Sequence, residues 1–183
     1  MTDKHTNIKK NTIRAFFAIR PDEAALKQLD RIAKQIKATC GGQKTTKSKI
    51  HLTLLFLGNI DIDQLDRFRV VAGSVRASSF NFSIEEIRYW KHNHIVYAGS
   101  NKHHPELLNL VTKLRSALSF NGVLFDQRAF VPHITLVRKV SHPTLPDLAK
   151  PISWLAHEWL LVQSKQTCHG AVYIPLYRWL LNH

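Results

Sequence analysis

Two short segments of the chain share a pattern of side chains that could transfer protons. Residues 51–55 read His51-Leu-Thr53-Leu-Leu, and residues 133–137 read His133-Ile-Thr135-Leu-Val. Because side chains alternate between the two faces of a β-strand, the His and the Thr of each segment should point to the same face, while the apolar residues pack against a core. The pattern therefore predicts two imidazoles and two hydroxyls that face one another across a shared cleft.

A pair of histidines can perform a displacement at phosphorus without a metal. An imidazole titrates near neutral pH, so a neutral ring can take a proton from water while a protonated ring gives one to a leaving oxygen. A cyclic phosphodiester suits this chemistry because its entering and leaving oxygens lie on opposite sides of phosphorus. Thr53 and Thr135 would then donate hydrogen bonds to the non-bridging oxygens, where negative charge develops.

A structural role is the alternative for each histidine. A strand histidine is often only a hydrogen-bonded structural residue, and a third His-x-Thr, His142-Pro-Thr144, lies in a proline-rich segment without apolar neighbours. We interpret that third copy as a chance match. The two longer copies occupy matching places in the two halves of the chain, and this repetition favours function.

The remaining histidines and cysteines do not suggest a metal site. His103 and His104 are interpreted as surface or packing residues, not as a metal pair, and Cys168-His169 has no second metal-type pair nearby. We therefore expect no metal and no other cofactor. Cys40 and Cys168 are too few for a disulfide framework and are interpreted as ordinary thiols in a reducing compartment.

The charge balance favours a polyanionic partner. Lys and Arg number 26 against 13 Asp and Glu, a formal net charge of +13 in 183 residues. This excess attracts RNA or DNA first and an anionic membrane surface second, although it can also serve only solubility. The N-terminal segment lacks the apolar core of a secretory signal, and no run approaches a membrane span. We expect a cytoplasmic monomer without a membrane partner.

The elements that must position the two motifs repeat in one order: apolar strand, proline-initiated helix, loop, motif strand. Mixed strands and helices with short links predict an α+β fold of mostly antiparallel sheets, with a flexible tail at 1–12 and a single domain at 13–183. The predicted elements are strands at 14–19, 51–58, 80–89, 95–99, 130–137, 159–162 and 171–177, helices at 21–40, 63–77 and 105–121, a turn at 91–94, a basic loop at 44–49 and a proline-rich loop at 141–151.

The residues around both motifs resemble a known family. His51-Leu-Thr-Leu-Leu-Phe-Leu-Gly58 and Pro132-His133-Ile-Thr-Leu-Val-Arg138 closely resemble the signatures of the two-histidine phosphoesterase superfamily, and within it the bacterial RNA 2′,3′-cyclic phosphodiesterases, historically called 2′-5′ RNA ligases. The resemblance covers most of the chain. It implies a bilobal fold, with two pseudo-symmetric lobes, helices on the outside and the active-site cleft between the lobes.

The resemblance also implies an activity and a set of roles. It implies metal-independent hydrolysis of RNA or nucleotide 2′,3′-cyclic phosphate ends to 2′-phosphates, with His51 as general acid and His133 as general base. It places a base-stacking aromatic at Phe56 and a substrate-binding arginine at Arg138. Strand alternation puts both on the face opposite the histidines, so a bend or a strand end is required, and a core position for Phe56 is an equal alternative.

Two other functions remain open from the sequence. The same groups run in reverse would join a 2′,3′-cyclic phosphate to a 5′-hydroxyl in a 2′-5′ linkage, although dilute ends in water favour hydrolysis. A non-catalytic RNA-binding module would explain the charge but not the two matched motifs. In the basic loop, Lys47 and Lys49 could contact RNA, and a solvated loop is the simpler interpretation.

Overall fold

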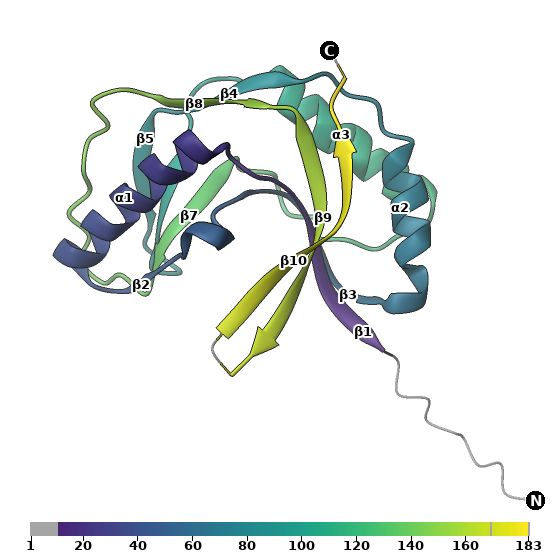
Figure 1. Cartoon of the computed structure of the whole chain (residues 1–183), viewed down its shortest axis with the longest axis horizontal. Coiled ribbons are helices and arrows are strands. Elements are labelled where there is room, and N and C mark those ends of the chain that lie inside the picture. Colours follow the sequence, from purple (N-terminus) through teal and green to yellow (C-terminus); the bar gives the residue numbers. More distant parts are fainter. Residues whose placement is uncertain (1–10, 169, 183) are drawn as a thin grey trace, which may run out of the picture.

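A computed structural model describes residues 11–168 and 170–182 (Figure 1). The predicted tail at 1–12 therefore lies almost wholly outside the described residues, and its last residue, Thr12, begins the first strand. The strands are β1 (Thr12–Ile19), β2 (Gln43–Lys44), β3 (Leu52–Asp61), β4 (Phe80–Ile84), β5 (Glu86–Trp90), β6 (Ile95–Gly99), β7 (His133–Arg138), β8 (Ile152–Ala156), β9 (Glu158–Thr167) and β10 (Gly170–Leu180). The helices are α1 (Glu23–Cys40), α2 (Leu65–Gly73) and α3 (Pro105–Phe120), with 3-10 turns at Lys47–Lys49 and Ile62–Gln64.

Two four-stranded sheets each carry one motif strand. Their strand orders are β10-β9-β1-β3 and β2-β7-β6-β5, and β4 pairs with β8 in a separate ribbon. In each large sheet the motif strand lies antiparallel to the strand that precedes the intervening helix, β3 beside β1 and β7 beside β6. The repeated order of strand, helix and motif strand is therefore confirmed, as is the α+β class with mostly antiparallel sheets.

The two repeats exchange their helices. α1 follows β1 of the first sheet but packs against β7 and β2 of the second, whereas α3 follows β6 of the second sheet and packs against β3 and α2 (Figure 1). Buried apolar side chains from both sheets and from α1, α2 and α3 form one contiguous core. Each motif strand is thus supported by the helix of the other repeat.

The local sequence explains α1 at both ends. The Asp22 carboxylate accepts a hydrogen bond from the backbone N–H of Ala25 at 2.7 Å, which satisfies one of the unpaired donors of the first turn. The helix ends where Gly41 adopts a φ of +71° and its N–H donates to the Lys37 carbonyl at 3.0 Å. The apolar stripe between these caps is buried, at Ala25, Leu26, Leu29, Ile32, Ala33 and Ile36.

Several boundaries differ from the sequence prediction. The strand that begins after His51 does not stop at Gly58, because Gly58 and Asn59 still pair with β1. The predicted strand at 80–89 is two strands, since the chain leaves the β4–β8 ribbon at Glu85 and enters the second sheet. The helix predicted at 63–77 begins later and ends at Gly73, and β8 was not predicted at all.

No helix in the described ranges, 11–168 and 170–182, has both the length and the apolar character needed to cross a membrane. Cys40 and Cys168 are free thiols, as predicted.

The cap of α1 gives a stability prediction. Asp22→Ala removes the acceptor for the Ala25 N–H, so we expect the free energy of unfolding to fall by about 1 kcal/mol. Urea unfolding followed by circular dichroism measures this change. Asp63→Ala is the matched control, because it removes the same charge from an exposed side chain. Equal losses in the two variants would show that charge, and not the cap, is responsible.

Candidate active site

His51 is held at the entrance of β3 by hydrogen bonds at both ring nitrogens. Its Nδ1 donates to the Lys49 carbonyl at 2.7 Å, because a carbonyl oxygen only accepts. In the neutral ring Nε2 is then the acceptor, and the Thr53 hydroxyl donates to it at 2.9 Å. The ring stacks on Phe16 with centroids 4.8 Å apart and meets Tyr173 edge-on at 5.2 Å. These contacts fix both the tautomer and the orientation of the imidazole.

His133 is held in the same way at the first residue of β7. Its Nδ1 donates to the carbonyl of Val131, again two residues earlier, at 2.7 Å. Two aromatic rings meet it edge-on, Trp90 at 4.6 Å and Tyr97 at 5.9 Å between centroids. Nε2 of the neutral ring is therefore left with a lone pair, and no protein donor to it is found among the described residues.

A β-bulge in β3 brings Phe56 to the face of the motif. The pairing of β3 with β1 skips one residue between Thr53 and Leu55, so Leu54 and Leu55 are both buried and strict alternation is broken. Phe56 consequently lies on the same face as Thr53, half-buried against the ring of Phe16 at 5.7 Å. The bend required by the sequence analysis is thus a bulge, and Phe56 lines the cleft.

The second motif strand has a bulge at the matching position. The pairing of β7 with β6 skips one residue between Thr135 and Val137, so Leu136 and Val137 are both buried. Arg138 then returns to the face of His133 and Thr135, with its side chain exposed to solvent. The two strands therefore present their fifth residue after the histidine in the same manner.

The two motifs meet in one cavity. It has a volume of about 330 Å³, and a second cavity of about 510 Å³ shares five of its lining residues, so the two are continuous. All six residues singled out from the sequence line the smaller cavity: His51, Thr53, Phe56, His133, Thr135 and Arg138. The geometry therefore places two imidazoles, two hydroxyls, one arginine and one aromatic ring around a single space.

Burial keeps both imidazoles neutral at neutral pH. It lowers the pKa of His51 to about 4, an effect that the bond to the Lys49 carbonyl opposes and that the nearby His133 and Arg138 charges reinforce. Burial also lowers the pKa of His133, again with help from Arg138 and against the bond to the Val131 carbonyl. An anion held between the rings would offset the positive charge of Arg138 and favour a protonated imidazole.

The basic loop contributes Lys44, which the sequence analysis did not assign to the site, and Lys49, for which it left RNA contact and solvation open. Both lysines line the cavity, whereas Lys47 forms an ion pair with Glu23. Lys44 is itself paired at 2.5 Å with the nearly buried Asp30 of α1, so it is not simply solvated. The position of Lys49 at the cavity is compatible with either interpretation.

Gly42 lets this loop approach the second motif strand. It has a φ of +82°, and a Cβ atom there would lie 2.6 Å from the carbonyl oxygen of Arg138. The paired glycines that precede the lysines were the available signal for this close approach.

His104 and His142, which we interpreted as unrelated to chemistry, line neither of these two cavities, whereas His92 lines the larger one. His142 is exposed in the proline-rich loop, and His104 hydrogen-bonds through Nε2 to the Ser100 hydroxyl at 2.8 Å. Within the described part of the chain, no group of three or more His, Cys, Asp or Glu side chains could hold a metal ion.

Comparison with known proteins gives consistent matches over most of the chain. Residues 19–97 match the family model of LigT-like phosphoesterases. The chain is 30% identical over 142 residues to the RNA 2′,3′-cyclic phosphodiesterase of Escherichia coli. The matched region covers 77% of this chain and 81% of that protein. It is 29% identical over 177 residues to the protein of the same name from Thermotoga maritima. That match covers 90% of this chain and 94% of the T. maritima protein.

Solved structures show the same likeness. The crystal structure of E. coli LigT complexed with 3′-AMP superimposes with a TM-score of 0.87 at 28% identity, over 94% of this chain and all of that one. The chain belongs to the LigT-like phosphoesterase family, which confirms the resemblance to two-histidine phosphoesterases drawn from its motifs.

The lowered pKa of His51 predicts how stability depends on pH. An unfolded histidine titrates near 6.5, so below that pH the unfolded chain takes up a proton that folded His51 does not. The contribution to stability is therefore complete above pH 6.5 and declines as the pH falls toward 4. We expect His51→Gln to reduce the loss of unfolding free energy between pH 7 and pH 5 by on the order of 1 kcal/mol.

Urea unfolding at the two pH values measures this difference. His142→Gln, in the exposed loop, is the matched control and should decline like the unaltered protein. A decline in His51→Gln as steep as in that control would contradict a buried neutral imidazole.

Proposed function

We propose that this protein hydrolyses the 2′,3′-cyclic phosphate ends of RNA or nucleotides to 2′-phosphates, with His51 and His133 as a metal-independent acid–base pair. The observation that carries the proposal is the matched pair of imidazoles, each tied through Nδ1 to a backbone carbonyl and lining one cavity with two threonines and an arginine. The names of the E. coli and T. maritima relatives support this activity.

Binding of an anionic substrate would favour the protonated imidazole that the reaction needs. The cyclic phosphate is an anion, and the Arg138 guanidinium at the cleft is suited to hold a phosphate oxygen. An anion between the rings would attract a proton to one imidazole and so work against the effect of burial. Thr53 and Thr135 would donate to the non-bridging oxygens as their charge grows.

In the proposed step, the Nε2 of neutral His133 takes a proton from water as the water oxygen attacks phosphorus. The bond between phosphorus and the 3′-oxygen breaks on the opposite side, and protonated His51 gives its Nε2 proton to that oxygen. This leaves a 2′-phosphate, a 3′-hydroxyl and the proton on His133. The assignment of roles follows the family resemblance.

One feature of the site supports the assignment of the base. No protein donor to His133 Nε2 is found among the described residues, so the neutral ring can offer its lone pair to water.

Substitution of the two histidines tests this function. With a nucleoside 2′,3′-cyclic phosphate as substrate and excess chelator present, we expect His51→Ala and His133→Ala each to lower kcat by roughly 10²- to 10⁴-fold, since each removes one proton transfer. The measurement is the release of nucleoside 2′-phosphate, resolved by chromatography.

His142→Ala is the matched control, because it removes a histidine from the same His-x-Thr tripeptide outside the cavity, and it should retain full activity. Turnover that survives loss of either motif histidine, or that requires a divalent metal, would contradict the proposal. Binding of RNA without any turnover in the unaltered protein would favour the non-catalytic alternative.

Arg138 gives a separate prediction in pH dependence. Its charge lowers the pKa of both imidazoles, so Arg138→Gln should raise both values and shift the pH profile of kcat/KM to higher pH. Loss of a charged hydrogen bond to phosphate should also lower kcat/KM roughly ten- to hundredfold. Arg31→Gln, on the exposed face of α1, is the matched control. An unshifted profile in Arg138→Gln would place its charge away from the histidines.

A further inference from the structure

The cleft continues well beyond the two histidines. The cavity that contains them opens into the cavity of about 510 Å³, and that one shares Phe56, Asp126 and Arg128 with a third of about 330 Å³ beside Arg14 and Gly58. From Thr53 to Gly58 this path follows β3 for roughly 15 Å, estimated from the rise per strand residue. That length exceeds the rise of about 3.4 Å per nucleotide in a stacked strand. The continuous groove therefore has room for more than the terminal nucleotide.

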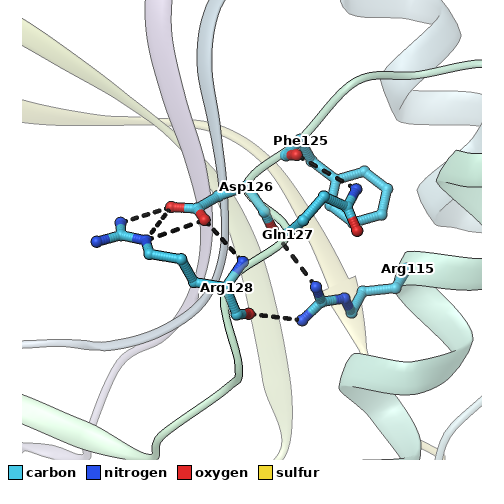
Figure 2. Close-up of polar contacts among 5 residues, drawn as sticks. All are labelled: Arg115, Phe125, Asp126, Gln127 and Arg128. Carbon is cyan, nitrogen blue, oxygen red and sulfur yellow. Dashed lines mark hydrogen bonds and ion pairs between the residues drawn. The ribbon is translucent and has the colours of Figure 1, made fainter.

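Asp126 and Arg128 line this groove from a loop whose backbone is anchored by hydrogen bonds (Figure 2). The N–H of Asp126 donates to the Phe56 carbonyl at 3.0 Å, which ties the loop to the motif strand. The Arg115 guanidinium of α3 donates to the carbonyls of Arg128 at 3.2 Å and Asp126 at 3.5 Å, while it lies over the ring of Phe125. The loop is thus anchored on both sides, and its side chains are set relative to the cleft.

The ion pair with Asp126 orients the guanidinium of Arg128 but engages only some of its N–H donors. Asp126 accepts from its Nε at 2.8 Å and its Nη2 at 2.5 Å, which occupies two of the five N–H donors of the guanidinium (Figure 2). The other three donors have no acceptor within residues 11–168 and 170–182, and the side chain is 82% exposed. Such a held guanidinium can bind a phosphate with little further loss of side-chain freedom.

The second cation of the groove, Arg14, has no partner among the described residues. Arg14 projects from β1, exposed, and makes no hydrogen bond or ion pair with the described residues. Along the two outer cavities four arginines face a single carboxylate, Asp126, which Arg128 already neutralises.

Half-buried aromatic side chains line the groove together with these cations. Phe56, Trp90 and Phe130 line the central cavity, and the ring of Trp90 is supported by Tyr97 at 4.1 Å. Aromatic rings and arginines in one groove are the combination that binds single-stranded nucleic acid, by base stacking and by backbone charge. An exposed patch of lysines alone would lack the stacking element.

We infer that this groove binds the nucleotides upstream of the cyclic phosphate, with Arg128 and Arg14 on successive backbone phosphates and the aromatic side chains against bases. The preferred substrate is then an RNA oligonucleotide and not a mononucleotide. This inference rests on the proposed function for the direction of the strand, because the terminal phosphate lies between His51 and His133.

The test compares two substrates that share one reacting end. A nucleoside 2′,3′-cyclic phosphate reaches only the histidine cavity, whereas a hexaribonucleotide with the same cyclic end also fills the groove. We expect Arg14→Ala and Arg128→Ala each to lower the ratio of kcat/KM for the hexamer to kcat/KM for the mononucleotide by roughly three- to tenfold. Each should also reduce the salt slope for the hexamer by about 0.7, the value for one phosphate contact on a single strand.

Arg31→Ala is the matched control for the general attraction of a basic protein, since this arginine is exposed on α1 outside all three cavities. An unchanged ratio in both groove variants, or an equal fall in Arg31→Ala, would overturn the inference.

Binding of a fluorescent hexaribonucleotide, measured by anisotropy, separates this inference from the proposed function. Weaker binding in Arg14→Ala than in Arg31→Ala would support the groove even if the mononucleotide were not hydrolysed. Equal binding in the two variants would overturn the inference even if hydrolysis by the histidine pair were established.

Discussion

The site depends on one hydrogen bond made twice, from the Nδ1 of a histidine to the backbone carbonyl two residues earlier. This bond requires that the carbonyl not be engaged in the sheet, and both histidines meet that condition because they stand at the entrance of their strands, before or at the first paired residue. With Nδ1 committed, the neutral ring presents Nε2 to the cleft. Position at the strand entrance therefore determines which nitrogen can do chemistry.

The rest of the fold keeps the two strand entrances facing one cavity. Each motif strand is an outer or near-outer member of its own sheet, and each is packed by the helix of the other repeat. Because α1 supports β7 and α3 supports β3, neither half can shift without moving the core under the other motif. The same interlocking joins the Lys44–Asp30 pair on β2 and α1 to the cavity wall.

The sequence predicted the motifs and the repeat correctly because both depend on local patterns: two-residue alternation for His and Thr, and proline, acid and glycine signals for α1 and α3. Strand alternation alone put Phe56 and Arg138 on the face opposite the histidines, so the sequence required a bend or a strand end for both. It did not specify a bulge, because a bulge is a property of cross-strand pairing and lies outside a single segment. The apolar doublets Leu54-Leu55 and Leu136-Val137 are the local trace of these bulges. β8 and the place of Lys44 in the site were missed for the same reason, since both arise from contacts distant in sequence.

The lowered pKa of the two imidazoles is compatible with the proposed acid–base chemistry. A pair of permanently charged rings beside Arg138 would repel one another, and a permanently charged base could not accept a proton. In the proposed mechanism, burial leaves both rings neutral until an anion binds, and one ring becomes protonated when a phosphate occupies the cleft. The aromatic rings packed against each imidazole contribute to that burial, so under this proposal they would matter to the chemistry as well as to the fold.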